Sequence, residues 1–498
     1  MHSQLNKELL TWRGWFLADP VSGRPLTLAA HTKHTHMLSL YASAERAQMA
    51  ATLAGMNSAQ IESACVEDFL AQHQNFLKEI QCAILIETPT RAITINPGSA
   101  HACPEGFLEV DDATEELFDE MQSRGFGERT ANPALDYDEV PGPFRYALAE
   151  RGKLVSGLET EPYLTIWGDS VIPMESLGGV VAPLEARRQG KTQVLLRQVL
   201  GAMRERGTPL STITTPFSYP FYRRAGFEYA FLRRRYTFPP QLLLGLKDVP
   251  SSLRYYPGPR RELAVPYQLA ILYELALAPM FQGYARRTPF QWASHLAGRN
   301  TDVYIWDGPE GPCAYAIIAV TPHHIAIREL LATTDIGLQG LLKALASLDS
   351  QTQELVWDAV PTYHLDRWVV EPDRVKTELT PEGTFRIIDI KTAMETRRFH
   401  WTGEGHIALS IEDNVCEWNT GTWTLSFDQG HAQATRVPTI LSESDCGSLD
   451  VRAFGLLYAG SIRAEEAVRY YGARLSTKQQ DLLDRVIFNR QPLLLESF

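Results

Sequence analysis

Cysteine is scarce in this chain of 498 residues and forms no recognisable pattern. None of the six cysteines lies at the C-x-x-C spacing of zinc ribbons and thiol redox motifs. A small disulfide scaffold is excluded as well, because its cysteines would be dense. The cysteines are Cys65, Cys82, Cys103, Cys313, Cys416 and Cys446. This usage predicts a cytoplasmic protein with reduced thiols.

Long apolar runs are also lacking. No run approaches the roughly 20 residues that a membrane-spanning helix needs. The first residues, MHSQLNKELLTWRGW, contain no basic segment followed by an apolar one, so they do not resemble a secretory signal. We therefore expect neither a membrane partner nor export.

Basic residues are in deficit. The chain has 47 Lys and Arg against 59 Asp and Glu, a formal net charge of −12. Nucleic-acid binding draws on clustered positive charge, so no nucleic-acid partner is expected. An acidic protein attracts cations, which would suit an amine substrate such as a polyamine, an aminoglycoside or a lysine-bearing peptide. The same charge could serve solubility alone.

A short histidine-rich run is the only feature that invites a metal hypothesis. His31, His34 and His36 are close enough in sequence to share an ion. No carboxylate or cysteine accompanies them at a recognised ligand spacing, and histidines in a polar loop are the commoner case. We expect no metal.

The length predicts about three or four domains, and a composition of 44% hydrophobic and 21% charged residues is that of a globular protein. In the first hundred residues, 44–80 are mostly helix-forming, whereas 82–86 and 92–95 alternate like strands. The role of this N-terminal part is not indicated by its sequence.

A strand, turn and helix between Gly178 and Arg206 carry most of the functional information. Residues 178–182 read as an apolar strand, 187–192 as a turn and 191–206 as an amphipathic helix. A helix N-terminus entered through a tight turn offers converging N–H groups and a positive dipole end, which suit a pyrophosphate. The alternative is an ordinary strand, turn and helix with Arg187 and Arg188 as solvated surface charge.

The preceding elements predict a mixed sheet of the α/β (α+β) class. A strand at 107–110 and a helix at 113–124 come first. Strands at 145–149 and 154–159 follow, joined at an Arg-Gly turn. Two further strands, at 163–167 and 172–182, lead to the turn.

The second half of the pattern resembles the GNAT acetyltransferase superfamily. Arg187-Arg188-Gln189-Gly190-Lys191-Thr192 resembles its R/Q-x-x-G-x-G/A turn, with Thr192 in place of the usual Gly or Ala. Phe221-Tyr222-Arg223-Arg224-Ala225-Gly226-Phe227-Glu228 follows at the expected distance. The resemblance implies that acetyl-CoA is the cosubstrate. Its pyrophosphate would be held by Arg187, Arg188, Gln189, Gly190, Lys191 and Thr192, and its pantetheine arm by the backbone of Val180, Val181 and Ala182.

Tyr222 is the candidate general acid. When an amine attacks a thioester, the tetrahedral intermediate expels a thiolate, and a nearby phenol can protonate the sulfur. The alternative is a half-buried aromatic residue that anchors a short helix. The surrounding motif favours the catalytic reading.

The rest of the chain resembles the Eis family of GNAT acetyltransferases. The segments Ile327-Arg328-Glu329-Leu330, Leu365-Asp366-Arg367-Trp368, Phe385-Arg386-Ile387-Ile388-Asp389 and Asp413-Asn414-Val415-Cys416-Glu417-Trp418-Asn419 occur in that family's order and spacing. The resemblance covers about residues 105–498. It implies a catalytic GNAT domain at 105–240, a GNAT-like domain without the acyl-CoA turn at 241–395 and a sterol-carrier-protein-like domain at 396–498, behind an extension at 1–104.

The Eis resemblance also bears on mechanism and assembly. In that family the terminal carboxylate serves as a base toward the acceptor amine, and this chain ends in the family's phenylalanine, Phe498. An α-carboxyl group has a pKa near ~3.5, so it is ionised at neutral pH. Family members form hexamers, so a homo-oligomer is expected here.

Two other functions remain open. The sterol-carrier-like domain could make the chain a non-catalytic binding protein for a lipid or another hydrophobic ligand. Alternatively, the chain could be a dedicated acetyltransferase for one natural product, with residues 1–104 modifying specificity or assembly.

Overall fold

The structure, a computed structural model, describes most of the chain from Glu105 onward and only short strands before it. The described residues are 13–18, 37–40, 60–65, 83–87, 92–95, 105–111, 114–126, 143–214, 219–246, 252–257, 264–296, 301–321, 323–348, 352–438, 446–487 and 490–496. The histidine run at 31–36 and Phe498 lie outside them.

Two compact units make up the chain. The smaller contains Met1–Gly106 together with Asp111–Leu117 and Ala149–Leu154. Its strands form two small sheets. In one, β1 (Arg13–Ala18) pairs antiparallel with β3 (Gln60–Cys65). In the other, β4 (Ala83–Glu87) pairs parallel with β2 (Met37–Leu40) and antiparallel with β5 (Ala92–Ile95).

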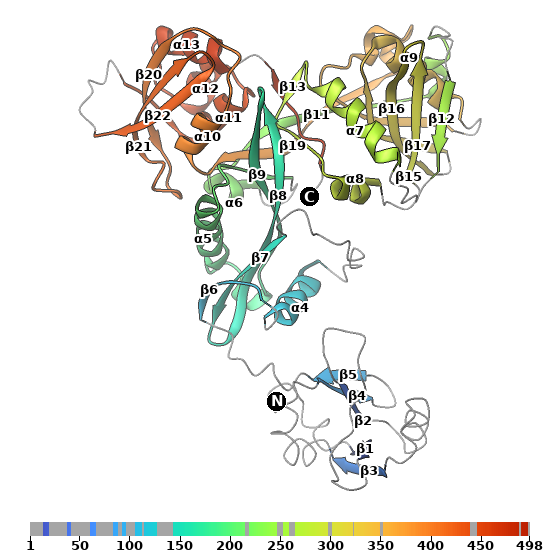
Figure 1. The fold of residues 1–498 in the computed structure, drawn as a ribbon, viewed down its shortest axis with the longest axis vertical. Coiled ribbons are helices and arrows are strands. Elements are labelled where there is room, and N and C mark those ends of the chain that lie inside the picture. Colours follow the sequence, from blue (N-terminus) through green and yellow to red (C-terminus); the bar gives the residue numbers. More distant parts are fainter. Residues whose placement is uncertain are drawn as a thin grey trace. The chain divides into compact units, whose positions relative to one another are not determined.

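Apart from Gly106 and the adjoining ends of β7 and β8, which belong to the smaller unit, the larger unit contains one 13-stranded sheet. Its order is β12-β15-β16-β17-β18-β11-β19-β10-β9-β8-β7-β6, with β14 paired to β8 (Figure 1). We call β6 to β11 the first α/β region and η3 to β19 the second. The first comprises β6 (Gly106–Glu109), α4 (Glu115–Phe126), β7 (Phe144–Glu150), β8 (Lys153–Trp167), β9 (Ser170–Val181), η2 (Leu184–Ala186), α5 (Lys191–Glu205), β10 (Leu210–Ile213), α6 (Tyr219–Arg224) and β11 (Glu228–Phe238).

The second α/β region repeats the plan of the first, with a helix after its third long strand. It comprises η3 (Pro240–Leu243), β12 (Ser252–Tyr256), α7 (Ala264–Leu277), β13 (Phe281–Gln282), β14 (Tyr284–Ala285), α8 (Pro289–Leu296), β15 (Thr301–Gly308), β16 (Gly311–Thr321), β17 (His324–Ala332), α9 (Asp335–Ala346), β18 (Glu354–Ala359), η4 (Leu365–Arg367), η5 (Pro372–Arg374) and β19 (Lys376–Ile387).

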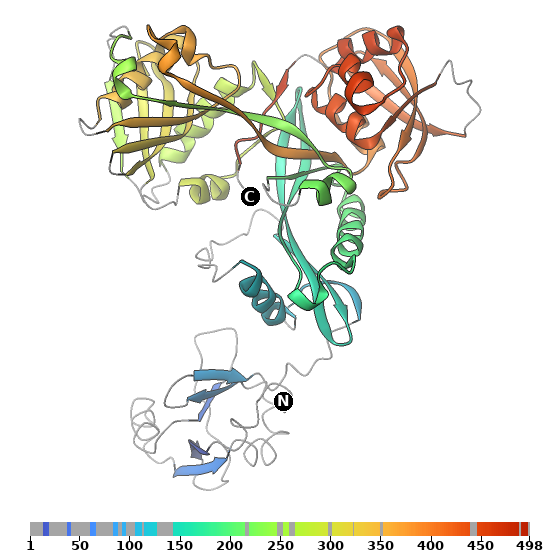
Figure 2. The ribbon, with the colours of Figure 1, turned by 180° about the vertical axis from the view of Figure 1, so that it is seen from behind.

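The two α/β regions exchange strands where they meet. β11, from the first region, pairs antiparallel with β18 of the second over Arg234–Phe238. β19, from the second region, pairs with β10 of the first over Phe385↔Thr212 and its neighbours. β11 and β19 also pair with each other along most of their length, and they are the long strands that span the middle of the view in Figure 2. Each region therefore completes its sheet with a strand of the other.

The C-terminal domain, which we define as α10 to β24, has a four-stranded sheet in the order β22-β21-β20-β23. Buried side chains of this sheet and its helices share one core with Trp167 and Phe385 from the two α/β regions. Its elements are α10 (Ile390–Thr396), β20 (Gly405–Glu412), β21 (Gly421–Asp428), β22 (His431–Val437), β23 (Cys446–Asp450), α11 (Val451–Ala459), α12 (Ala464–Tyr471), α13 (Thr477–Ile487) and the short β24 (Gln491–Pro492).

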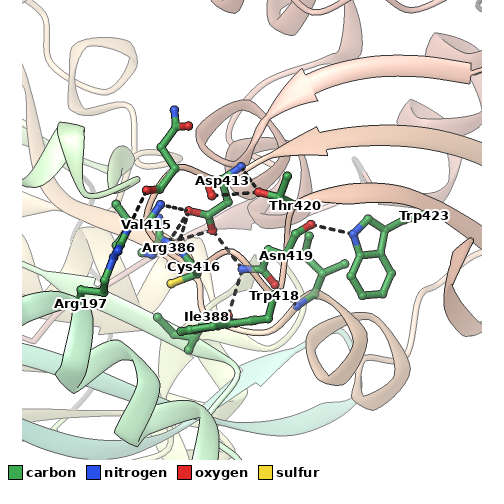
Figure 3. A network of polar contacts seen from close by, with 12 residues as sticks. Arg197, Arg386, Ile388, Asp413, Val415, Cys416, Trp418, Asn419, Thr420 and Trp423 are labelled. Carbon is green, nitrogen blue, oxygen red and sulfur yellow. Dashed lines mark hydrogen bonds and ion pairs between the residues drawn. The ribbon is translucent and has the colours of Figure 1, made fainter. Parts of the chain in front are cut away.

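A buried ion pair joins β19 to the C-terminal domain (Figure 3). Nη2 of Arg386 donates to both carboxylate oxygens of Asp413, at 2.9 and 2.8 Å, and both side chains are at most 1% exposed. Asn419 donates to the same carboxylate and to the carbonyl of Ile388. Gly226, after α6, has φ of +85°, and a Cβ there would lie 1.4 Å from Nη1 of Arg386. The glycine of the Ala225-Gly226-Phe227 motif is thus required by the same ion pair.

The sequence-based elements of the larger unit are largely confirmed. The predicted helices at 113–124 and 191–206 are α4 and α5, and the Arg151-Gly152 turn has positive φ at both residues, as a two-residue hairpin turn requires. Two strands predicted at 154–159 and 163–167 are one strand, β8, which runs through Pro162. Proline removes one N–H donor, but its fixed φ is compatible with an extended strand.

The helix-forming reading of residues 44–80 is wrong for Gln60–Cys65, which form β3. Pairing with β1 overrides the local propensity there. The strands predicted at 82–86 and 92–95 are confirmed as β4 and β5.

Among the helices that the structure describes, none has the length and apolarity to cross a membrane.

We predict that Arg386→Met destabilises the fold far more than loss of a surface arginine. The change leaves Asp413 charged and buried without its cation, which costs about 3–5 kcal/mol. Arg235→Met is the control, because Arg235 pairs with Asp358 while half exposed and should contribute at most about 1 kcal/mol. Urea unfolding followed by circular dichroism measures both. Equal midpoints for the two variants would contradict the prediction.

Candidate active site

The turn between β9 and α5 has the backbone conformation of an anion-binding loop. Arg188 has φ of +62° and Gly190, the residue before the helix, has φ of +76°. Left-handed residues within a turn direct successive N–H groups to one side. No side chain caps α5, so the helix N-terminus remains available to a ligand. Residues 187–190 are exposed.

Thr192, the departure from the usual motif, is accommodated by a partner on the neighbouring strand. Its Oγ1 lies 3.0 Å from Oγ of Ser156 on β8, and Ser156 also donates to the carbonyl of Val181 at 3.2 Å. The threonine side chain therefore points toward β8. Sequence analysis missed Ser156, since a lone serine in a strand carries no signal.

β9 changes its pairing just before the turn. Its parallel pairing with β10 extends from Leu210↔Met174 to Thr212↔Ser176, before the last part of β9. On the other side, β8 shows an irregularity between Gly157↔Val181 and Glu159↔Gly178. Among the described residues, β9 does not pair with β10 beyond Ser176, so the edge of Gly178–Val181 toward β10 can meet an extended ligand.

The predicted pantetheine-binding residues differ in the contacts that they make. The carbonyl of Val181 accepts from Ser156, and that of Ala182 accepts from Nε of Arg187 at 3.0 Å. Val180 is half-buried and packs against the core that contains Leu195. Arg187 is thus partly engaged by its own turn, whereas the Arg188 side chain makes no hydrogen bond to another described residue.

Tyr222 lies in α6 and is 7% exposed. Its ring meets Phe221 edge-on at 5.0 Å and Phe227 at 6.4 Å. No hydrogen bond joins its hydroxyl to another described residue. Burial raises the pKa of Tyr222 to about 12. The phenol is therefore a proton donor at neutral pH.

In the second α/β region, the N-terminus of the corresponding helix is capped by a side chain. Thr334 precedes α9, and its Oγ1 accepts the N–H of Gly337 at 3.1 Å. Asp335 follows in the first turn and places a negative charge where a phosphate would lie. The two helix N-termini are therefore opposite in character.

The C-terminal segment is fixed as far as Glu496. β24 pairs parallel with β13, and the N–H of Leu493 donates to the carbonyl of Gln282 at 2.8 Å. Leu493 and Leu494 are each 2% exposed, and they pack into two different cores. Phe498, the predicted base, lies outside the described residues.

A buried charge cluster that sequence analysis missed surrounds the end of this segment. Arg287 donates to both carboxylate oxygens of Glu329, at 3.0 and 2.7 Å, and its Nε donates to Oε1 of Glu496 at 2.8 Å. Tyr315 donates to Glu329 at 2.6 Å. Although burial opposes it, Arg287 and His295 bring the pKa of Glu329 below its ordinary value. The available signal was a charged Arg-Glu pair within the strand HIAIRELLA, whose other residues after His324 are apolar.

Acidic side chains on β8 lie near the same segment. Burial, followed by the charge of Glu161, raises the pKa of Tyr163, and Glu496 adds to this effect. Burial likewise raises the pKa of Glu161, and the charge of Glu159 raises it further. Glu161, Glu159 and Glu496 are therefore neighbours, with Glu159 paired to Arg145 at 3.3 Å and Glu496 to Arg287 at 2.8 Å. Among the described residues, no group of three or more metal-ligand side chains could hold an ion.

Three parts of the chain match known domain families. Residues 109–230 and residues 283–387 each match an acetyltransferase (GNAT) domain. Residues 390–495 match a sterol carrier protein domain. No curated protein matches the chain in sequence.

Solved structures share the fold at low sequence identity. A protein of unknown function from Enterococcus faecalis V583, described as a probable N-acyltransferase, is 20% identical with a TM-score of 0.70. A GCN5-related N-acetyltransferase from Anabaena variabilis is 17% identical, with a TM-score of 0.68. Eis1 from Mycobacterium abscessus is 19% identical, with a TM-score of 0.62. Each similarity covers 79% of this chain and 99% of the other.

These findings confirm the predicted α/β fold of tandem GNAT domains with mixed sheets, followed by a sterol-carrier-protein-like domain. On the strength of its two GNAT domains, the chain is an acyltransferase.

Proposed function

We propose that the chain transfers the acetyl group of acetyl-CoA to a primary amine. The observation that carries this proposal is the uncapped N-terminus of α5, entered through left-handed residues beside the part of β9 that β10 does not pair. The turn suits a pyrophosphate, and the edge of β9 suits the amide groups of pantetheine. In this proposal Arg188, Gln189, Gly190, Lys191 and Thr192 hold the phosphates, and Arg187 adds its charge.

The proposed reaction is direct attack. The amine nitrogen forms a bond to the thioester carbonyl carbon and creates a tetrahedral intermediate. Collapse of this intermediate breaks the carbon–sulfur bond, the sulfur takes the proton of Tyr222, and the nitrogen loses a proton to a base. Products are an amide and CoA. The phenol suits its part, because burial raises the pKa of Tyr222 to about 12 and leaves it protonated.

We assign the base to the terminal carboxylate of Phe498. Residues 490–496 are held in place, because Leu493 and Leu494 are buried in two cores, and this supports the assignment. A carboxylate with an ordinary pKa is ionised at neutral pH and can accept the ammonium proton, directly or through water.

The proposed acceptor is cationic. Glu159 and Glu161, two residues apart on β8, face the same side of that strand, and the whole chain has a net charge of −12. Negative charge near the acceptor would draw in an aminoglycoside, a polyamine or a lysine side chain.

The second GNAT domain would not bind acyl-CoA. Thr334 occupies the helix end that a phosphate would need, and Asp335 would repel the phosphate.

The proposed domain boundaries are an N-terminal extension at 1–104 and domains at 105–240, 241–395 and 396–498.

We also propose membership of the Eis family, a cytoplasmic location and assembly into a homo-oligomer. An apolar stripe on α7 supports self-association, since Tyr267, Ile271 and Leu275 lie one helical turn apart and are 72, 43 and 58% exposed.

We expect the purified protein to release CoA from acetyl-CoA when an amine is present. The panel is spermidine, tobramycin and a lysine peptide, and the readout is free thiol together with the acetylated product by mass spectrometry. Background thiol release with every amine would count against the acetyltransferase proposal and favour a non-catalytic role for the sterol carrier domain.

Two glycines of the turn and helix provide a matched test of cofactor binding. Gly190→Ala should cost about 1–2 kcal/mol and weaken CoA binding, because alanine disfavours positive φ. Gly201→Ala, within α5, should stabilise by about 0.5–1 kcal/mol and leave binding unchanged. A Cβ at either position meets no atom within 4 Å, so backbone conformation separates the two. Thermal unfolding and calorimetric titration with CoA measure both effects, and unchanged CoA affinity in Gly190→Ala would remove the turn from the site.

Tyr222→Phe should lower kcat by about 10²-fold while leaving the affinity for acetyl-CoA unchanged. The ring packing against Phe221 and Phe227 is retained, so the variant should fold. Because the Tyr222 pKa is raised to about 12, the wild-type rate should show no decline from this group between pH 8 and pH 10. Tyr219→Phe, also on α6, is the control. Equal rates for both variants would assign Tyr222 a packing role.

A further inference from the structure

A buried glutamine reaches the strand edge that the proposed cofactor would follow. Gln122 lies on α4 and is 4% exposed, and its Nε2 donates to the carbonyl of Gly179 on β9 at 2.6 Å. A carbonyl oxygen can only accept, so this bond fixes which end of the amide is the nitrogen. The other end, Oε1, is therefore a hydrogen-bond acceptor, and it is buried without a donor among the described residues.

A buried oxygen without a donor is uncommon in a folded protein. Most buried polar side-chain atoms have a partner, and an unpaired one lowers stability. Oε1 of Gln122 therefore needs a donor that the described residues do not supply. An amide oxygen accepts from N–H and O–H groups, and an ammonium offers three N–H donors. The chemistry of this oxygen thus suits an amine.

The side-chain position that Gly179 lacks lies close to this oxygen and to a carboxylate. Gly179 has φ of +56°, a conformation that favours glycine. A Cβ there would lie 3.4 Å from Oε1 of Gln122 and 3.3 Å from Oε2 of Glu159 on β8. The other oxygen of Glu159 lies 3.3 Å from Nε of Arg145, which holds the carboxylate in place. One neutral and one charged oxygen therefore flank the same point beside β9.

This point lies toward the acetyl end of the proposed cofactor. With the phosphates at 187–192 and the pantetheine arm along Val180 to Ala182, the thioester comes last, toward Gly178 and Gly179. The edge of β9 becomes open just before these glycines, because the pairing with β10 ends at Thr212↔Ser176. An amine that attacks the thioester would therefore come close to Gln122.

Gln122 and Tyr222 lie on opposite faces of β9. Successive side chains of a strand point to opposite faces. Val180 packs against the core that contains Tyr222, whereas a Cβ on Gly125 of α4 would lie 2.4 Å from Cγ2 of Val181. α4 thus covers one face and the proposed general acid lies with the other. An amine held at Gln122 and a thiolate that leaves toward Tyr222 would use different sides of the thioester.

We propose that Gln122 is a specificity-determining residue whose Oε1 accepts an N–H of the substrate amine, with the charge of Glu159 beside it. This inference rests on the proposed function and adds an amine-binding group to the same site. It also gives a reason for the unpaired oxygen, since the donor arrives with the substrate.

Two substitutions separate amine binding from support of β9. Gln122→Met keeps the approximate size of the side chain and removes both polar groups. Gln122→Lys can still donate to the carbonyl of Gly179, but it places a cation where Oε1 accepts. If Gln122 only supports β9, the lysine should restore what the methionine loses. If Oε1 binds the amine, the lysine should be worse than the methionine. Gln198→Met, at an exposed position of α5, is the matched control.

Steady-state kinetics with spermidine or tobramycin, whichever the wild type acetylates, measure the effect. Gln122→Met should raise the KM for the amine by about 10–100-fold, as expected for loss of a hydrogen bond from a charged donor. Gln122→Lys should raise it further, because like charges repel. The KM for acetyl-CoA should stay within about twofold in both variants, and Gln198→Met should match the wild type in both constants.

Calorimetric titration of the same amines into CoA-saturated protein tests the contact without turnover. The dissociation constant should rise in the same order, from wild type to Gln122→Met to Gln122→Lys. An unchanged amine affinity in Gln122→Met, or recovery in Gln122→Lys, would overturn the inference while the acetyltransferase proposal stands. If the wild type binds the amines but acetylates none, the acetyltransferase proposal fails, and the titration alone decides the role of Gln122. A wild type that binds neither amine would refute the inference outright.

Discussion

The ion pair between Arg386 and Asp413 is the contact on which the arrangement of the larger unit depends. Arg386 lies in β19, which pairs with both β10 and β11, and Asp413 lies in the C-terminal domain directly after β20. Neither side chain reaches solvent, so each charge is tolerable only while the other is in place. The sheet that presents the proposed acyl-CoA turn is thereby tied to a domain that takes no direct part in the proposed chemistry.

The proposed site shows how two related domains can differ in function through a few residues. Both α/β regions place a helix after their third long strand, yet Gly190 leaves one helix end open and Thr334 closes the other. The closed region contributes in another way. Its strand β17 supplies Glu329, which holds Arg287 beside the C-terminal segment. The second region thus supports the first rather than duplicating it.

Local patterns in the sequence predicted the strand, turn and helix at Gly178–Glu205, because periodicity and turn chemistry act over a few residues. The strand exchange could not be predicted this way, since Arg233 and Thr380 meet across 147 residues. The Arg287 cluster joins residues 42 and 209 positions apart. For the segment from Asp413 to Asn419, the sequence showed only a resemblance to the Eis family. The structure supplies its physical reason, which is the network around Arg386 (Figure 3).

The exchange of β11 and β19 also affects how the protein folds during its synthesis on the ribosome. β11 emerges before its partner β19, and their contact at Arg233 and Thr380 spans 147 residues. At about 5–20 residues per second, synthesis of that interval takes roughly 7–30 s. Throughout it, β10 and β11 expose unpaired backbone edges that could join another nascent chain. A holdase chaperone that covers these edges would therefore matter more during translation than after it.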